Sequence, residues 1–192
     1  GGDKILDSIT SNGNIAGDGA SIYIDSARVI LDNSVFSDNN ALNNGGDVFI
    51  TSLVSDTSKI ENCTFANDTS AAAAAAIWVD SSNVLINRTT ITACQGATGS
   101  AITQIDGGWV GLVYNTIVDN WNASGGAVYC NGGNMELTGN IIAINTGTNE
   151  DVSDGVGGVT SNGFNVIGDG QTTGTAIAWQ ASDTTGLFIT PL

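Results

Sequence analysis

This chain of 192 residues contains no histidine, a single proline and only four basic residues. Without histidine, and with no CxxC pattern among its three cysteines, the sequence excludes a structural zinc site. Nineteen acidic residues give a net charge of −15, so the surface repels phosphate backbones and anionic membranes, and we expect no nucleic-acid partner. No stretch approaches 18 consecutive apolar residues, and we therefore expect no direct membrane insertion.

What the sequence does contain favours many short strands joined by tight turns. It has 26 glycines, a hydrophobic content of 41% and abundant Asn, Ser, Thr and Asp, a mixture typical of turns between strands. The length suits one domain with a continuous core. Residues 1–3 lack the features of a secretory signal, and we interpret the sequence as a mature or excised part of a protein.

Two independent markers repeat along the chain with a period of about 25 residues. The first is a branched apolar residue that follows a small or polar one, at Ile22, Val48, Ile77, Ile102, Val128 and Val152. The second is an asparagine that follows an apolar segment, with a slip of one residue at some repeats, at Asn33, Asn62, Asn87, Asn115, Asn140 and Asn165. The shared period predicts a repeat of two strands per unit.

A parallel β-helix explains both markers, because each of its coils stacks on the last and identical positions lie above one another. Stacked branched side chains form the core, and stacked asparagines form a ladder that satisfies the backbone of the turns. We therefore predict an all-β, right-handed parallel β-helix of six to seven coils. Residues 1–16 form an initial strand or N-terminal coil, 17–168 the repeats, and 169–192 a terminal coil or assembly strands, all in one domain.

Short units of the sequence resemble the repeats of a known superfamily. Residues 125–128 (Gly-Gly-Ala-Val) and 115–120 (Asn-Thr-Ile-Val-Asp-Asn) are similar to repeats of right-handed parallel β-helix proteins of the pectate-lyase-like superfamily, especially those of polymorphic outer-membrane and archaeal surface proteins. Residues 161–168 and 183–188 resemble the closing coils of secreted bacterial and methanogen β-helix proteins. The resemblance implies the fold, whereas function depends on the individual residues.

The sequence lacks the catalytic residues that enzymes of this superfamily use. Pectate-lyase-like elimination requires calcium-binding aspartates and a basic residue that abstracts a proton, but Arg28, Lys59 and Arg88 lie beside separate strands. Polygalacturonase-like hydrolysis requires an Asp-Asp pair together with Gly-His-Gly and Arg-Ile-Lys motifs, all of which are absent. We therefore expect no lyase or hydrolase activity.

Acidic residues offer two further possibilities. Asp25, Asp80 and Asp106 come at similar places at the end of the first strand of their coils. Two of them could form a carboxylate pair for inverting hydrolysis. We prefer the interpretation that they form a solvated acidic face. A possible calcium site comprises the hard oxygen ligands Glu150, Asp151 and Asp154, although an exposed acidic turn needs no ion. No other cofactor is expected.

The tryptophans and sequons bear on glycans. Trp78, Trp109, Trp121 and Trp179 could stack sugars if they shared one face, but we expect them mainly to pack. Four Asn-x-Ser/Thr sequons are candidates for glycosylation in a secretory route, namely Asn62, Asn67, Asn87 and Asn122.

Three cysteines cannot all pair within one chain. Cys63, Cys94 and Cys130 are therefore candidates for a disulfide, and Cys63 is the preferred bridge between chains because we expect it to face away from the Asn62 side of its strand. Taken with the apolar final segments 175–179 and 186–190, this predicts an extracellular or cell-surface structural subunit that self-associates into a layer, sheath, filament or appendage. An adhesin or glycan-binding module is the alternative.

Overall fold

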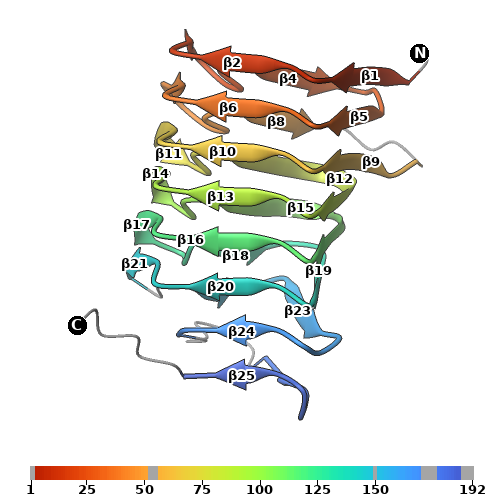
Figure 1. The fold of residues 1–192 in the computed structure, drawn as a ribbon, viewed down its shortest axis with the longest axis vertical. Coiled ribbons are helices and arrows are strands. Elements are labelled where there is room, and N and C mark those ends of the chain that lie inside the picture. The colour runs from red at the N-terminus through yellow and green to blue at the C-terminus, as the bar shows by residue number, and fades with distance from the viewer. Residues whose placement is uncertain (1–2, 52–55, 149–150, 170–176, 187–192) are drawn as a thin grey trace.

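The computed structural model describes residues 3–51, 56–148, 151–169 and 177–186, which form 25 short strands and no helix. The strands repeat in coils that stack along one axis, from the N-terminal coil at the top of Figure 1 to the C-terminal strands at the bottom. Every strand pair in these residues is parallel. The described part of the chain therefore holds no helix that is long and apolar enough to cross a bilayer.

The largest sheet, sheet A, has 11 strands and forms two sides of each coil. Its first column contains β4 (Ile22–Asp25), β8 (Val48–Thr51), β18 (Val128–Asn131), β22 (Val152–Asp154) and the starts of β12 (Ile77–Asn87) and β15 (Ile102–Val113). Its second column contains the ends of β12 and β15 together with β1 (Lys4–Asp7), β5 (Val29–Asp32), β9 (Ser58–Glu61), β19 (Asn134–Thr138) and β23 (Gly158–Ser161). The two long strands thus run around the corner between the columns.

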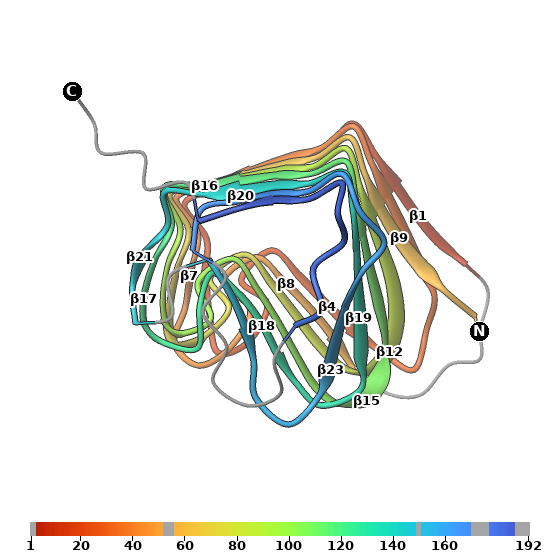
Figure 2. The same cartoon turned by 90° about the horizontal axis from the view of Figure 1, so that it is seen from below.

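Two further sheets close the coil, as the view along the axis in Figure 2 shows. Sheet B contains β2 (Thr10–Asn12), β6 (Val35–Ser37), β10 (Thr64–Ala66), β13 (Thr90–Thr92), β16 (Thr116–Val118), β20 (Ile141–Ala143), β24 (Val166–Ile167) and β25 (Thr184–Thr185). Sheet C contains β3 (Ile15–Ala16), β7 (Asn40–Ala41), β11 (Thr69–Ala73), β14 (Gln95–Thr98), β17 (Trp121–Ser124) and β21 (Thr146–Gly147). The sequence predicted only two strands per unit, because strands of two or three residues are too short to show an apolar period.

The strand register confirms the first repeat marker at every step. In sheet A the paired residues are Ile22 with Val48, Val48 with Ile77, Ile77 with Ile102, Ile102 with Val128, and Val128 with Val152. All of them except Ile22 are buried in the core. Opposite them, Phe36 and Phe65 of sheet B are fully buried and stack with their ring centroids 4.9 Å apart. Each such side chain contributes about 1.5–3 kcal/mol by leaving water.

An asparagine ladder runs inside the turn between the second column of sheet A and sheet B. Asn115 donates its backbone N–H to Asn140 Oδ1 over 2.9 Å, and Asn140 donates in the same way to Asn165 Oδ1. The side-chain amides of the three residues also donate to carbonyls in the coil before, for example Asn140 Nδ2 to Leu112 O over 2.8 Å. Asp183 ends this first ladder, since its carboxylate accepts hydrogen bonds from Asn165 and donates none.

The predicted ladder is wrong at its first three positions. Asn33 and Asn62 are exposed in the left-handed region, with φ of 47° and 53°, and the inward position belongs to the following residue, Ser34 or Cys63. Asn87 ends β12 on the outer side and donates to Glu61 Oε1. Asparagine suits two positions of this turn: the exposed residue in the left-handed conformation and the next residue, whose side chain points into the ladder. The repeat marker in the sequence did not distinguish these two positions.

A second ladder, which sequence reasoning missed, lies inside the turn between sheets B and C. It comprises Asn14, Asn39, Asp68, Cys94, Asn120 and Asn145. Asp151 ends it by accepting the backbone and side-chain N–H groups of Asn145. From Asn39 onward, each member of the second ladder comes five residues after the inward residue of the turn between sheets A and B in the same coil. This constant spacing is the sequence pattern that could have revealed the second ladder.

Candidate functional site

The outer face of sheet C is hollowed into a groove of about 340 Å³. Neighbouring strands stack in register there, so that Asn40 pairs with Thr69, Thr69 with Gln95, and Gln95 with Trp121. These four outward side chains form one row along the axis. The groove is lined by Asn40, Thr69, Ser70, Ala71, Gln95, Gly96, Ala97, Trp121 and Ala123.

Small residues keep the groove open beside that row. Ala71, Ala97 and Ala123 carry only a methyl group, whereas Gly96 is buried and faces the interior between them. A Cβ atom at Gly96 would approach Gly99 O to 3.0 Å and Ala75 N to 3.4 Å, so this position favours glycine. Because adjacent strands lie about 4.8 Å apart, neighbouring side chains of the row are also spaced by about 4.8 Å.

The lining is uncharged and combines amides, hydroxyls and one indole. Trp121 is 43% exposed, so part of its ring is available for contact. Amide and hydroxyl groups both donate and accept hydrogen bonds, and an aromatic face packs against an apolar face of a ligand. A neutral ligand that carries many hydroxyl groups and an apolar side matches this chemistry.

The other tryptophans do not join Trp121 in a shared platform. Trp78 stacks on Phe49 at 6.1 Å between ring centroids, and Phe49 stacks on Tyr23 at 5.0 Å, so these rings cover one another's faces. The Trp109 ring lies across Gly111, where a Cβ atom would come within 2.3 Å of it. Trp179 packs against the core.

The predicted calcium site does not form in the described residues. Glu150 lies outside them, and Asp151 is buried, where it ends the second ladder and also accepts the backbone N–H of Asp169. Asp154 is 2% exposed, and burial raises the pKa of its carboxyl group, which disfavours the ionised form that calcium binds. No group of three or more Cys, Asp or Glu side chains could hold a metal ion within the part of the chain that the structure describes.

The carboxylates considered for hydrolysis lie on the outer corner of sheet A. Asp25 and Asp80 are separated by Thr51 in the same column, which places them two strands and about 9.6 Å apart. Each accepts a hydrogen bond from the serine that follows it. Asp106 is exposed in the left-handed turn one position later, so it is not in register with the other two.

The four sequons differ in accessibility. Asn62 and Asn67 are exposed, and Asn87 is half-buried. Asn122 is fully buried, donates to Thr146 O and accepts from the Gly126 N–H. The folded chain therefore cannot carry a glycan on Asn122, and this candidate is wrong.

The three cysteines are free thiols at 0–2% exposure. Burial raises the pKa of the Cys63 thiol to about 11, that of Cys94 well above its usual value, and that of Cys130 in the same direction. Because Asn62 is the exposed residue of its turn, Cys63 faces inward and donates to Glu61 O over 3.1 Å. The prediction of a bridge between chains through Cys63 is therefore wrong for the folded state.

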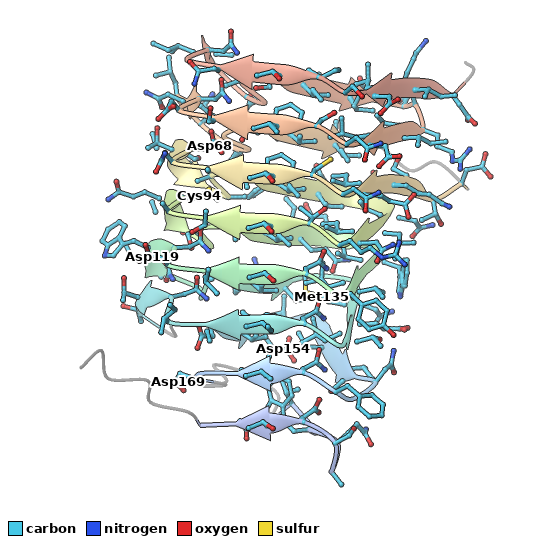
Figure 3. The ribbon with its side chains drawn as sticks, in the orientation of Figure 1. Asp68, Cys94, Asp119, Met135, Asp154 and Asp169 are labelled. Carbon is cyan, nitrogen blue, oxygen red and sulfur yellow. The ribbon has the colours of Figure 1, made fainter. Side chains whose placement is uncertain are left out.

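Figure 3 shows Asp68 and Cys94 in adjacent coils at the sheet C end, with Met135 and Asp154 further along the axis.

No curated protein and no solved structure shows a significant match to this sequence. The family model described as the right-handed beta helix region matches residues 1–142, which are the coils whose parallel register is given above. The chain therefore belongs to the right-handed beta helix family.

Proposed function

We propose that this chain is a non-catalytic, extracellular β-helix module that binds a neutral glycan in the groove of sheet C. The single observation that supports this function is the uncharged row of Asn40, Thr69, Gln95 and Trp121 beside a floor of small residues. Sugars offer hydroxyl groups to the amides and an apolar side to the indole. The net charge of −15 disfavours acidic polysaccharides.

The test is a titration of the intact chain with neutral and with acidic oligosaccharides, followed by calorimetry. Trp121→Ala should weaken neutral-glycan binding about tenfold, because an aromatic contact contributes about 1–1.5 kcal/mol. Trp109→Ala is the matched control, since that ring lies on sheet A. Equal losses in both variants, or preferred binding of acidic glycans, would contradict the proposal. Formation of unsaturated products or reducing ends would contradict its non-catalytic part.

A second proposed function is that of a structural surface subunit that self-associates, and the outer face of sheet B favours it. One outward column runs through all eight strands and contains only Thr, Val and Ile, at Thr10, Val35, Thr64, Thr90, Thr116, Ile141, Val166 and Thr184. On so acidic a chain, an uncharged face is where two copies can approach with least repulsion. The segments first expected to assemble, 175–179 and 186–190, lie largely outside the described residues.

Sedimentation velocity at rising concentration tests this second function. Thr90→Glu in sheet B should reduce association, whereas Thr160→Glu, an exposed substitution of the same type in β23 of sheet A, should leave it unchanged. A chain that stays monomeric at millimolar concentration would refute self-association through this face.

A further inference from the structure

Two aspartates lie together inside the solenoid, where the second ladder passes from one coil to the next. Asp47 and Asp68 are both 0% exposed. Asp47 directly precedes β8, at the inward position that Ala76, Ala101 and Ala127 occupy in later coils. Asp68 stands in the ladder. Two carboxyl groups therefore replace the apolar or amide side chains that the repeat places here in most coils.

Neutral donors surround the pair. Asn39 Nδ2 lies 2.6 Å from Asp47 Oδ1 and 3.4 Å from Asp68 Oδ1, and the Asn39 backbone N–H donates to Asp68 Oδ1 over 3.0 Å. Ser21 Oγ donates to Asp47 Oδ1 over 3.0 Å, and Cys94 Sγ lies 3.8 Å from Asp68 Oδ2. Asp47 Oδ2 receives no hydrogen bond from any described donor. That oxygen is therefore the natural position for a proton.

No lysine or arginine donates to either carboxyl group in the described residues. Two buried negative charges without a cation would cost many kcal/mol, and neighbouring carboxyl groups avoid this cost by sharing a proton. Burial, a hydrogen bond to Asp68 and the charge of Asp68 together raise the pKa of Asp47 to about 10. Burial also raises the pKa of Asp68, which hydrogen bonds partly offset.

We propose that Asp47 and Asp68 hold one proton between them, carried on Asp47 Oδ2 and donated to the Asp68 carboxylate, and that this acid pair is a pH-sensitive joint between two coils. The proton leaves to solvent hydroxide as the pH rises, and two like charges then face each other in the interior. The remaining titratable group at the joint is the Cys94 thiol, which stays neutral because burial raises its pKa. Ser21 and Asn39 complete the surroundings and do not titrate.

The sign of the effect follows from the proton count. Above the unfolded pKa near 3.8, the unfolded chain releases this proton and the folded chain keeps it. The stabilisation is therefore complete below that pH and is lost progressively as the pH rises toward the folded pKa. One retained proton makes the unfolding equilibrium constant rise about tenfold per pH unit.

Urea unfolding of the intact chain between pH 5 and pH 9 tests the joint. Asp47→Asn keeps an acceptor for Asn39 and Ser21 and donates an amide N–H to Asp68, without a proton to lose. The ratio of the wild-type unfolding constant to that of Asp47→Asn should rise about tenfold per pH unit. Asp119→Asn, an exposed substitution at a turn, should run parallel to wild type. If the unfolding constants of Asp47→Asn and of the wild type changed with pH in the same way, the proposal would be overturned.

Infrared spectroscopy of the wild-type chain gives a second measurement that needs no variant. At pH 8 the folded protein should show the carbonyl stretch of one protonated carboxylic acid, and this band should vanish on unfolding in urea at the same pH. A folded chain with every carboxyl group ionised at pH 8 would also overturn the proposal.

Discussion

Removal of one amide from the middle of the first ladder should come close to unfolding the chain. Asn140 Oδ1 accepts hydrogen bonds from the backbone N–H and the side-chain amide of Asn115, and Asn140 Nδ2 donates to Leu112 O and Asn165 Oδ1. Asn140→Ala leaves about three buried groups without a partner, each at a cost of about 1–3 kcal/mol. We expect a loss of about 3–9 kcal/mol, against a total stability of about 5–15 kcal/mol that is usual for a domain.

Asn62→Ala is the matched control, because the sequence marker treated both asparagines alike. Asn62 is exposed and donates to Asp32 Oδ1 over 2.8 Å at the surface. Its loss should cost about 1–2 kcal/mol, mainly because alanine is strained in a left-handed turn. Guanidinium unfolding followed by far-ultraviolet circular dichroism measures both variants. If Asn140→Ala costs no more than Asn62→Ala, the ladder does not hold the coils as described.

Three further outcomes are expected. All three thiols should resist a thiol reagent in the folded chain and react after unfolding in denaturant; rapid labelling of the folded chain would contradict their burial. Expressed through a glycosylating secretory route, the chain should carry no glycan on Asn122, so Asn122→Gln should leave the glycoform masses unchanged while Asn67→Gln can remove one site. Although burial opposes it, hydrogen bonds from Ser161, Asn165 and Gln180 lower the pKa of Asp183, so Asp183→Asn should flatten the loss of stability as the pH falls below about 4; an unchanged acid transition would refute this role.

The sequence placed the coils correctly because their core residues are large and apolar, whereas the residue before each of them in the sequence is small or polar. Ile77, Ile102 and Val128 stack as their spacing predicted, since a branched side chain at the wrong position would expose the whole strand. Sheet C was missed, because its strands contain Ala, Gly, Thr and Asn, whose pattern also suits a loop. Periodicity detects apolar burial and not backbone pairing.

The candidate groove could be predicted only in part. Trp121 was considered as a sugar contact, but its alignment with Gln95 and Thr69 depends on strands that no apolar pattern marks. The carboxylates show the opposite error. Asp151 looks like an exposed ligand in sequence, yet it accepts hydrogen bonds inside the solenoid. Whether an acidic side chain is exposed or accepts a buried hydrogen bond depends on the residues of the neighbouring coil, which lie far away in the sequence.

The two ladders also give the solenoid a direction. Between neighbouring ladder members, each asparagine side-chain oxygen accepts from the residue in the coil before, and each asparagine backbone N–H donates to the residue in the coil after. The carboxylates of Asp183 and Asp151 only accept. A coil placed between two others meets the same pattern on both sides, so length can change by whole coils, each adding about 4.8 Å. The number of coils therefore sets the length of the molecule, and each ladder ends where a carboxylate accepts from its last asparagine.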